Sequence, residues 1–195
     1  MIRILLPLIV LTGAAEAACP TADDMTRGIK FTSASGEYEA FHSVGADMVE
    51  GMFGLDSHQG SRTMLARGLY LVEVVAIENG KADPATRSTY SFPLPPSEMP
   101  LPVPGGGWSV TVATFADGRI GSEKQIYSFG QLTRQTYQAC SYDMMPITIR
   151  YPDENDPQRR DVLHYLPELG ISYLAEFHDR DASDIYDYIS IETSQ

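Results

Sequence analysis

Histidines and carboxylates are the residues of this sequence with the clearest chemical potential. The histidines are His42, His58, His164 and His178, and no two of them are spaced as paired metal ligands would be. The nearest approach to a cluster of metal ligands is HDRDASDIYD, which begins at His178. Its oxygens suit Ca²⁺, but their spacing departs from the calcium-loop pattern and Arg180 lies among them, so we predict a solvated acidic turn. We expect no metal site and no cofactor.

Sequence signatures of common enzyme classes are absent. The chain has no G-x-S-x-G elbow, H-E-x-x-H motif, Walker sequence, dinucleotide fingerprint or C-x-x-C pair. Catalytic groups can still assemble from distant residues, so catalysis is disfavoured rather than excluded. We predict no catalytic residue. An enzyme acting on envelope sugars would need two carboxylates about 5 to 9 Å apart across a cleft.

Two cysteines, Cys19 and Cys140, are the remaining reactive side chains. In an oxidising compartment two cysteines of a small exported domain usually pair, so we predict a disulfide between them. Lipidation of Cys19 is the alternative. It is disfavoured because Glu16-Ala17-Ala18 lacks the leucine that lipoprotein signals usually carry three residues before the cysteine.

The N-terminus has the layout of a secretory signal peptide. Arg3 precedes an apolar run from Ile4 to Leu11, and the small-residue site Ala15-Glu16-Ala17 follows. We therefore predict cleavage of residues 1–17, a single domain over residues 18–195 and a periplasmic location. The apolar run is shorter than the roughly 20 residues that span a bilayer, and no second candidate follows, so we expect no transmembrane segment after cleavage.

The net charge of -12 argues against nucleic acid as a partner. Such acidity repels phosphate backbones, and Arg159-Arg160 is the only adjacent basic pair.

Period-2 alternation and frequent turn signals predict an all-β fold. A short helical turn capped by Thr21 is expected first. The predicted strands are 28–33, 37–44, 48–54, 61–66, 69–78, 87–92, 108–116, 123–129, 132–139, 142–151, 160–166, 170–178 and 185–192. Ser35-Gly36, Asn79-Gly80 and Asp117-Gly118 supply residues that tolerate the positive φ of tight hairpins. Because no segment has a convincing helical stripe, we expect an antiparallel meander.

A Pro/Gly-rich segment, residues 93–107, separates the two groups of strands. Proline lacks a ladder donor, so this segment is predicted to be a surface strap and not a central strand. A ligand for a proline-recognition domain is the alternative interpretation.

Alternation also predicts which side chains share a face. In strand 69–78, Leu71 and Val75 should face one way and Tyr70 and Val74 the other, with both faces covered. Strand 108–116 should be half-buried. In the last strand Ile185, Ile189 and Ile191 should oppose Tyr186, Tyr188 and Ser190. Tyrosines are spread over most strands, which suits a binding face or ordinary packing. The candidate binding aromatics are Tyr70, Trp108, Tyr165 and Tyr173.

Two segments, Ser61–Val74 and Arg159–Phe177, resemble each other, each running from an Arg through a short strand to a Gly and a Tyr-Leu pair. In the second, Pro167 removes a ladder donor and Gly170 permits unusual backbone angles. We predict a bulge or sharp corner between Leu166 and Gly170 rather than an active-site loop.

The strand CSYDMMPITIRY and the corner YLPELGISYL, after a signal peptide and an early cysteine, resemble uncharacterised exported proteins of Gram-negative bacteria, especially alphaproteobacteria. The Tyr-x-Pro-x-x-Gly corner is more remotely similar to periplasmic domains with a strongly curved open sheet, akin to the lipoprotein carriers of the outer-membrane localisation pathway. Those carriers shelter acyl chains on a concave apolar face. For this chain the resemblance implies a curved sheet or half-barrel but little about the ligand, and it carries over no functional residue.

The sequence thus favours a non-catalytic periplasmic module that binds an apolar or amphipathic, lipid-like ligand or a protein partner on a curved sheet. A structural or assembly factor of the cell envelope, pairing through exposed strand edges, is the alternative.

Overall fold

Strands dominate the molecule, as the sequence predicts. The structure is a computed structural model that describes residues 18–55, 58–153 and 156–194, so the predicted signal peptide lies outside the described residues. Its 3₁₀ helices are η1 (Ala22–Thr26), η2 (Pro84–Thr86) and η3 (Pro96–Glu98). Its strands are β1 (Ile29–Ser33), β2 (Tyr38–Ser43), β3 (Met48–Gly54), β4 (Gln59–Ala66), β5 (Tyr70–Glu78), β6 (Lys81–Ala82), β7 (Ser88–Ser91), β8 (Gly107–Ala116), β9 (Arg119–Phe129), β10 (Thr133–Tyr137), β11 (Cys140–Arg150), β12 (Arg160–Leu166), β13 (Ile171–His178), β14 (Ser183–Ile185) and β15 (Tyr188–Thr193).

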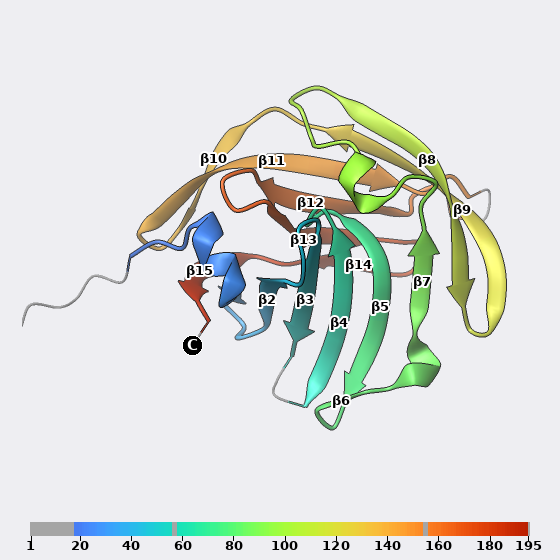
Figure 1. Ribbon diagram of the computed structural model, residues 1–195, viewed down its shortest axis with the longest axis horizontal. Helices are drawn as coiled ribbons and strands as arrows, with labels where there is room; N and C mark the ends of the chain where they lie inside the picture. Colours follow the sequence, from blue (N-terminus) through green and yellow to red (C-terminus); the bar gives the residue numbers. More distant parts are fainter. Residues whose placement is uncertain (1–17, 56–57, 154–155, 195) are drawn as a thin grey trace, which may run out of the picture.

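These strands form one antiparallel sheet that is strongly curved and not closed, which confirms the predicted fold class. The order is β14-β13-β12-β11-β9-β8-β7-β5-β4-β3-β2-β1-β15, with β10 beside β11 and β6 beside β5. Figure 1 shows β13 crossing behind the N-terminal strands β2 to β5, with β11 passing above them. The two ends of the order, β14 and β15, are consecutive in the chain, so the sheet rolls back toward its own beginning.

Bulges at three positions overturn part of the predicted alternation. Extra residues lie at Val72 of β5, Ala175 of β13 and Ile189 of β15, where the register shifts against the neighbouring strand. A bulge reverses the face of every later side chain in the strand. Leu71 and Val74 therefore share a face, contrary to the prediction. In β15 Tyr188 and Ile191 are buried together while Ile189 is exposed.

Over residues 171–175, before its short ladder with β14, the edge of β13 is held by separate hydrogen bonds. The backbone N–H of Ser172 donates to the Gly68 carbonyl oxygen at 2.8 Å, and the Tyr186 N–H donates to the Ala175 carbonyl at 2.9 Å. The Leu174 N–H donates to the carboxylate of Glu39. Buried backbone groups at a strand edge need such partners, so these contacts fix where the sheet stops.

The hairpins β4–β5 and β12–β13 correspond to the two similar sequence segments. Each has one bulge in its second strand, and their turns meet where Gly68 contacts Ser172. Pro167 and Gly170 form the β12–β13 turn, in which Gly170 has a φ of +68° and its N–H donates to Leu166.

Two hydrophobic cores lie on opposite faces of β12. Its neighbouring residues Tyr165 and Leu166 point in opposite directions and belong to different cores. The first core is centred on Phe31, Phe41, Tyr137 and Tyr173. The second contains Tyr70, Tyr127, Ile147 and Tyr165. β12 is thus covered on both faces.

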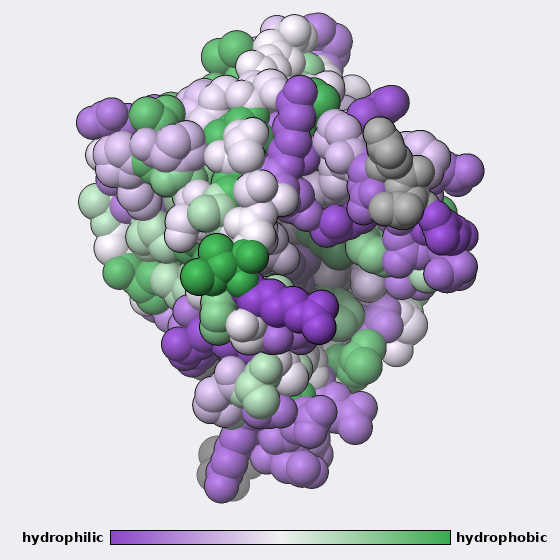
Figure 2. Space-filling model, turned by 90° about the vertical axis from the view of Figure 1, so that its right-hand side faces the viewer, coloured by the Kyte–Doolittle hydropathy of each residue, from purple (hydrophilic) through white to green (hydrophobic). Residues whose placement is uncertain are grey.

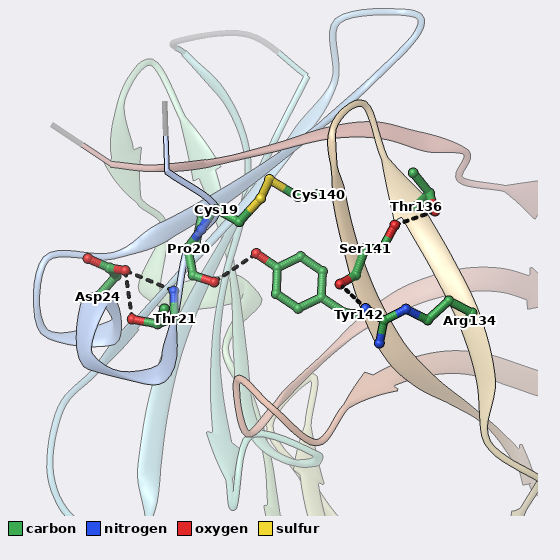
Figure 3. Close-up of a disulfide and its surroundings, with 9 residues drawn as sticks. All are labelled: Cys19, Pro20, Thr21, Asp24, Arg134, Thr136, Cys140, Ser141 and Tyr142. Carbon is green, nitrogen blue, oxygen red and sulfur yellow. Dashed lines mark hydrogen bonds between the residues drawn. A yellow bond between two sulfur atoms is a disulfide. The ribbon is translucent and has the colours of Figure 1, made fainter. Parts of the chain in front are cut away.

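The disulfide between Cys19 and Cys140 confirms the predicted pairing and leaves Cys19 no thiol for lipidation. Figure 3 shows it beside the hydrogen bond from the Tyr142 hydroxyl to the Pro20 carbonyl oxygen, 2.7 Å long. The Asp24 carboxylate accepts from the Thr21 N–H and hydroxyl at the start of η1. The N-terminal segment is thereby attached to the β10–β11 hairpin.

The predicted strap joins β7 to β8 and packs on the β4–β5 turn. Met99 is buried, and the Tyr70 hydroxyl donates to the Pro100 carbonyl oxygen at 2.6 Å. Arg67 donates to the carbonyl oxygens of Pro96 and Ser97. Among the described residues, no helix is long and apolar enough to cross a membrane.

Candidate functional site

The roll of the sheet encloses a cavity of about 370 Å³. Its volume lies within the range of roughly 300 to 1,000 Å³ that is typical of small-molecule sites. Apolar side chains from both halves of the sheet form most of its wall. They include Phe53, Leu65, Leu69, Leu71, Val74, Ile149, Leu163, Leu174 and Phe177. The shifts of face at the β5 and β13 bulges place Val74 and Phe177 in this wall.

The cavity opens toward a groove between the β8–β9 hairpin and the segment after β11. Tyr90, Glu123, Tyr151 and Arg159 line both the cavity and the groove, and we call these four residues the neck. Figure 2 looks onto the side where β7 to β9 lie, and a hollow opens in this face. A ligand therefore has a route from solvent to the apolar interior.

Polar side chains at the neck form a connected network. The Arg159 guanidinium pairs with the Glu123 carboxylate at 2.9 Å and lies over the Tyr151 ring, 4.3 Å from its centroid. The Tyr151 hydroxyl donates to Oδ2 of Asp161 at 2.6 Å. Gln125 donates to Glu123 at 2.9 Å and accepts from the Tyr127 hydroxyl at 2.6 Å. Burial raises the pKa of Asp161, and the Tyr151 hydrogen bond and Arg159 only partly oppose this.

Glu39 is a second carboxylate in the cavity wall, on β2. Burial raises its pKa to about 8, against hydrogen bonds from the Tyr188 hydroxyl and the Leu174 N–H that favour the charged form. At neutral pH this side chain is therefore largely protonated. It supplies a polar but uncharged contact in the interior.

The predicted binding aromatics pack in the cores, outside the cavity wall. Tyr70 is fully buried, with its ring centroid 5.1 Å from that of Trp108. The Tyr173 hydroxyl hydrogen-bonds to Tyr137 at 2.7 Å and to Nδ1 of His164 at 2.8 Å. Tyr165 is buried in the second core. These four residues shape the molecule, while the aromatic side chains at the cavity are Tyr90, Tyr127, Tyr151, Tyr186 and Tyr188 with Phe53 and Phe177.

The acidic stretch after β13 is built as a turn. Oδ1 of Asp179 accepts from the backbone N–H groups of Asp181 and Ala182 at 2.8 and 2.6 Å. His178 is bonded to Glu176 and Ser183 at 2.7 and 2.9 Å. Over residues 18–55, 58–153 and 156–194, no group of three His, Cys, Asp or Glu side chains is placed to hold a metal ion.

Comparisons with known proteins identify no relative. No protein-family profile, no curated protein and no solved structure matches the chain. The resemblance to exported alphaproteobacterial proteins and to lipoprotein carriers stays a prediction.

The residues of the neck were not singled out from the sequence. Glu123 lies on β9, whereas Arg159 directly precedes β12 and Asp161, beside the neck, lies on β12. In the sequence each looks like an ordinary surface charge. Glu123 and Asp161 occupy inward positions of their strands, which is visible only once the register of β9, β11 and β12 is known.

Proposed function

We propose that this protein is exported to the periplasm and binds an apolar or amphipathic ligand, without catalysis, inside the rolled sheet. The observation that carries the proposal is the apolar cavity of about 370 Å³ with a polar neck open to one side. A protein that needed only a stable core would gain by filling this space, because unfilled apolar volume lowers stability. The disulfide fits an oxidising compartment.

A cavity-filling substitution tests this function. Nile red, an apolar fluorophore, should bind the wild-type protein with increased emission, because it leaves water for the cavity. Leu174→Trp places a larger side chain in the cavity wall and should weaken Nile red binding by about tenfold or more. Ile189→Trp, at a position 44% exposed on β15, is the matched control and should bind like the wild type.

Equal Nile red binding by both variants and the wild type would show that the dye uses another surface, and would refute the proposal. Near-UV circular dichroism of Leu174→Trp checks that the fold is intact, since a misfolded variant would lose binding for a different reason.

A second candidate, assembly of the cell envelope by strand pairing, is favoured by one edge of the sheet. β9 pairs with β11 only over Ile126–Phe129. Its earlier part, residues 119–125, has a ladder partner among the described strands on the β8 side alone. Ile120 in this part is 86% exposed. An open edge of this kind can accept a strand from another chain.

A further inference from the structure

Charge is unbalanced at the neck of the cavity. Besides the largely protonated Glu39, the cavity wall contains the carboxylates Glu123 and Asp161 and a single cation, Arg159. Arg159 is already paired with Glu123 at 2.9 Å. Asp161 has no ion pair of its own within the described part of the chain. Its Oδ2 accepts from Tyr151, and its Oδ1 is shielded from water without a hydrogen-bond partner.

Such an arrangement is unfavourable for the polypeptide by itself. A carboxylate oxygen that is removed from water and left without a partner has lost hydration energy that nothing replaces. Asp161 lines the cavity beside the neck, where it is bonded to Tyr151. The deeper wall around Leu71 and Leu174 is apolar. A complementary ligand would therefore carry one positive charge at the neck and an apolar chain inside.

We propose that the ligand bound in this cavity is a long-chain amine, with its ammonium group at the neck near Glu123 and Asp161 and its alkyl chain against the apolar wall. The inference rests on the proposed function, because it assigns a ligand class to the same cavity. The two carboxylates and Arg159 leave a net charge of one negative at the neck, which an ammonium neutralises. An alcohol of equal length would gain the apolar contacts alone, and a fatty acid would add a further negative charge.

Competition against Nile red with three amphiphiles of equal chain length tests the inference. Decylamine, decanol and decanoate are compared below the concentrations at which they form micelles. We expect decylamine to bind about tenfold more tightly than decanol, and decanoate to bind more weakly than both. Asp161→Asn should bring decylamine to the affinity of decanol and leave decanol unchanged.

Asp117→Asn is the matched control for the change in net charge. Asp117 lies in the exposed β8–β9 turn, where its φ of +52° also suits asparagine, and this variant should keep the wild-type preference. Glu123→Gln is a second test at the neck if Asp161→Asn fails to fold, and it should also reduce the preference for decylamine.

Different results contradict the two proposals. Equal affinity for decylamine and decanol in the wild type, tighter binding of decanoate, or an unchanged preference in both neck variants would overturn the assignment of an amine while the cavity remained a binding site. Failure of all three amphiphiles to displace Nile red, together with unchanged dye binding by Leu174→Trp, would contradict the binding function itself.

Discussion

Glu39 shows how a single residue can serve both the edge of the sheet and its interior. Its carboxyl group accepts from the Leu174 N–H at the unpaired edge of β13 and from the Tyr188 hydroxyl of β15, 3.3 Å away. It therefore links β2 to the two strands where the sheet rolls over. The same position is desolvated, so these contacts are made by a group that resists ionisation.

The raised pKa of Glu39 predicts a pH dependence of stability. The folded state holds this proton up to about pH 8, whereas a glutamate in the unfolded chain loses it near 4.5. Over that window the folded state binds more protons, so stability falls as pH rises and levels off above the folded pKa. Glu39→Gln should remove this component, worth on the order of a few kcal/mol, and be more stable than the wild type at about pH 9.

Urea denaturation at about pH 5 and about pH 9 measures the effect. Glu98→Gln in the exposed strap is the control and should follow the wild type. A wild-type protein that gains stability relative to Glu39→Gln as pH rises would contradict the assigned environment.

Substituting alanine for two turn glycines should destabilise the protein to different extents. Both Gly68 and Gly170 have positive φ, but a Cβ on Gly68 would lie 2.1 Å from the Gly170 carbonyl oxygen, while a Cβ on Gly170 meets nothing within 4 Å. Gly170→Ala should therefore lower the free energy of unfolding by only about 1 kcal/mol, the cost of a left-handed conformation at alanine. Gly68→Ala should lower it by about 2 to 3 kcal/mol or more, because its turn must also move away from β13. Chemical denaturation of both variants gives the comparison. Equal losses would show that the two turns do not meet.

At the scale of elements, the sequence predicts nearly every strand but not the direction of all side chains. The turns Asn79-Gly80 and Asp117-Gly118 have the positive φ values that their residue types predict, and β8 is half-buried as expected. The prediction of which side chains share a face was wrong in β5 after Val72 and in β15 at Ile189. These bulges have no glycine or proline to mark them, because they arise from fitting one curved strand against another.

Strand 69–78 also shows that an apolar composition does not distinguish a binding cavity from a packed core. It lies in the middle of the sheet order, as its apolar run predicts, yet one of its faces borders the cavity rather than a filled core. Apolar residues that line a binding site and apolar residues that pack a core look the same in a sequence. The candidate site could therefore not be distinguished from the interior before the curvature of the sheet was known.

The disulfide joins elements that no strand ladder connects. Its sequence separation is 121 residues, so reducing it frees a long loop in the unfolded chain. In the chain-entropy model this lowers stability by about 4 to 5 kcal/mol. We expect the double variant Cys19→Ser/Cys140→Ser to have a free energy of unfolding lower by this amount than that of the oxidised wild type. Its midpoint of urea denaturation should be lower accordingly. An unchanged midpoint would mean that the N-terminal segment contributes nothing to the fold.

At the scale of the whole molecule, the sheet is rolled but its interior is only partly filled. Side chains fill two cores, and the remaining space lies between the N-terminal strands and the inner face of β11 to β13. Bulges bend the strands in which they lie, and the contacts at the β13 edge join the two halves of the roll. The binding proposal thus depends on the roll as a unit and not on any one motif.

Native mass spectrometry of the protein isolated from the periplasm of a Gram-negative host tests the central claim most directly. We predict a wild-type species that carries one small amphiphile of discrete mass, releases it on collisional activation, and has no counterpart in Leu174→Trp. A wild-type protein found only at the mass of the disulfide-bonded polypeptide, both as isolated and after incubation with decylamine, decanol and decanoate, would contradict the claim.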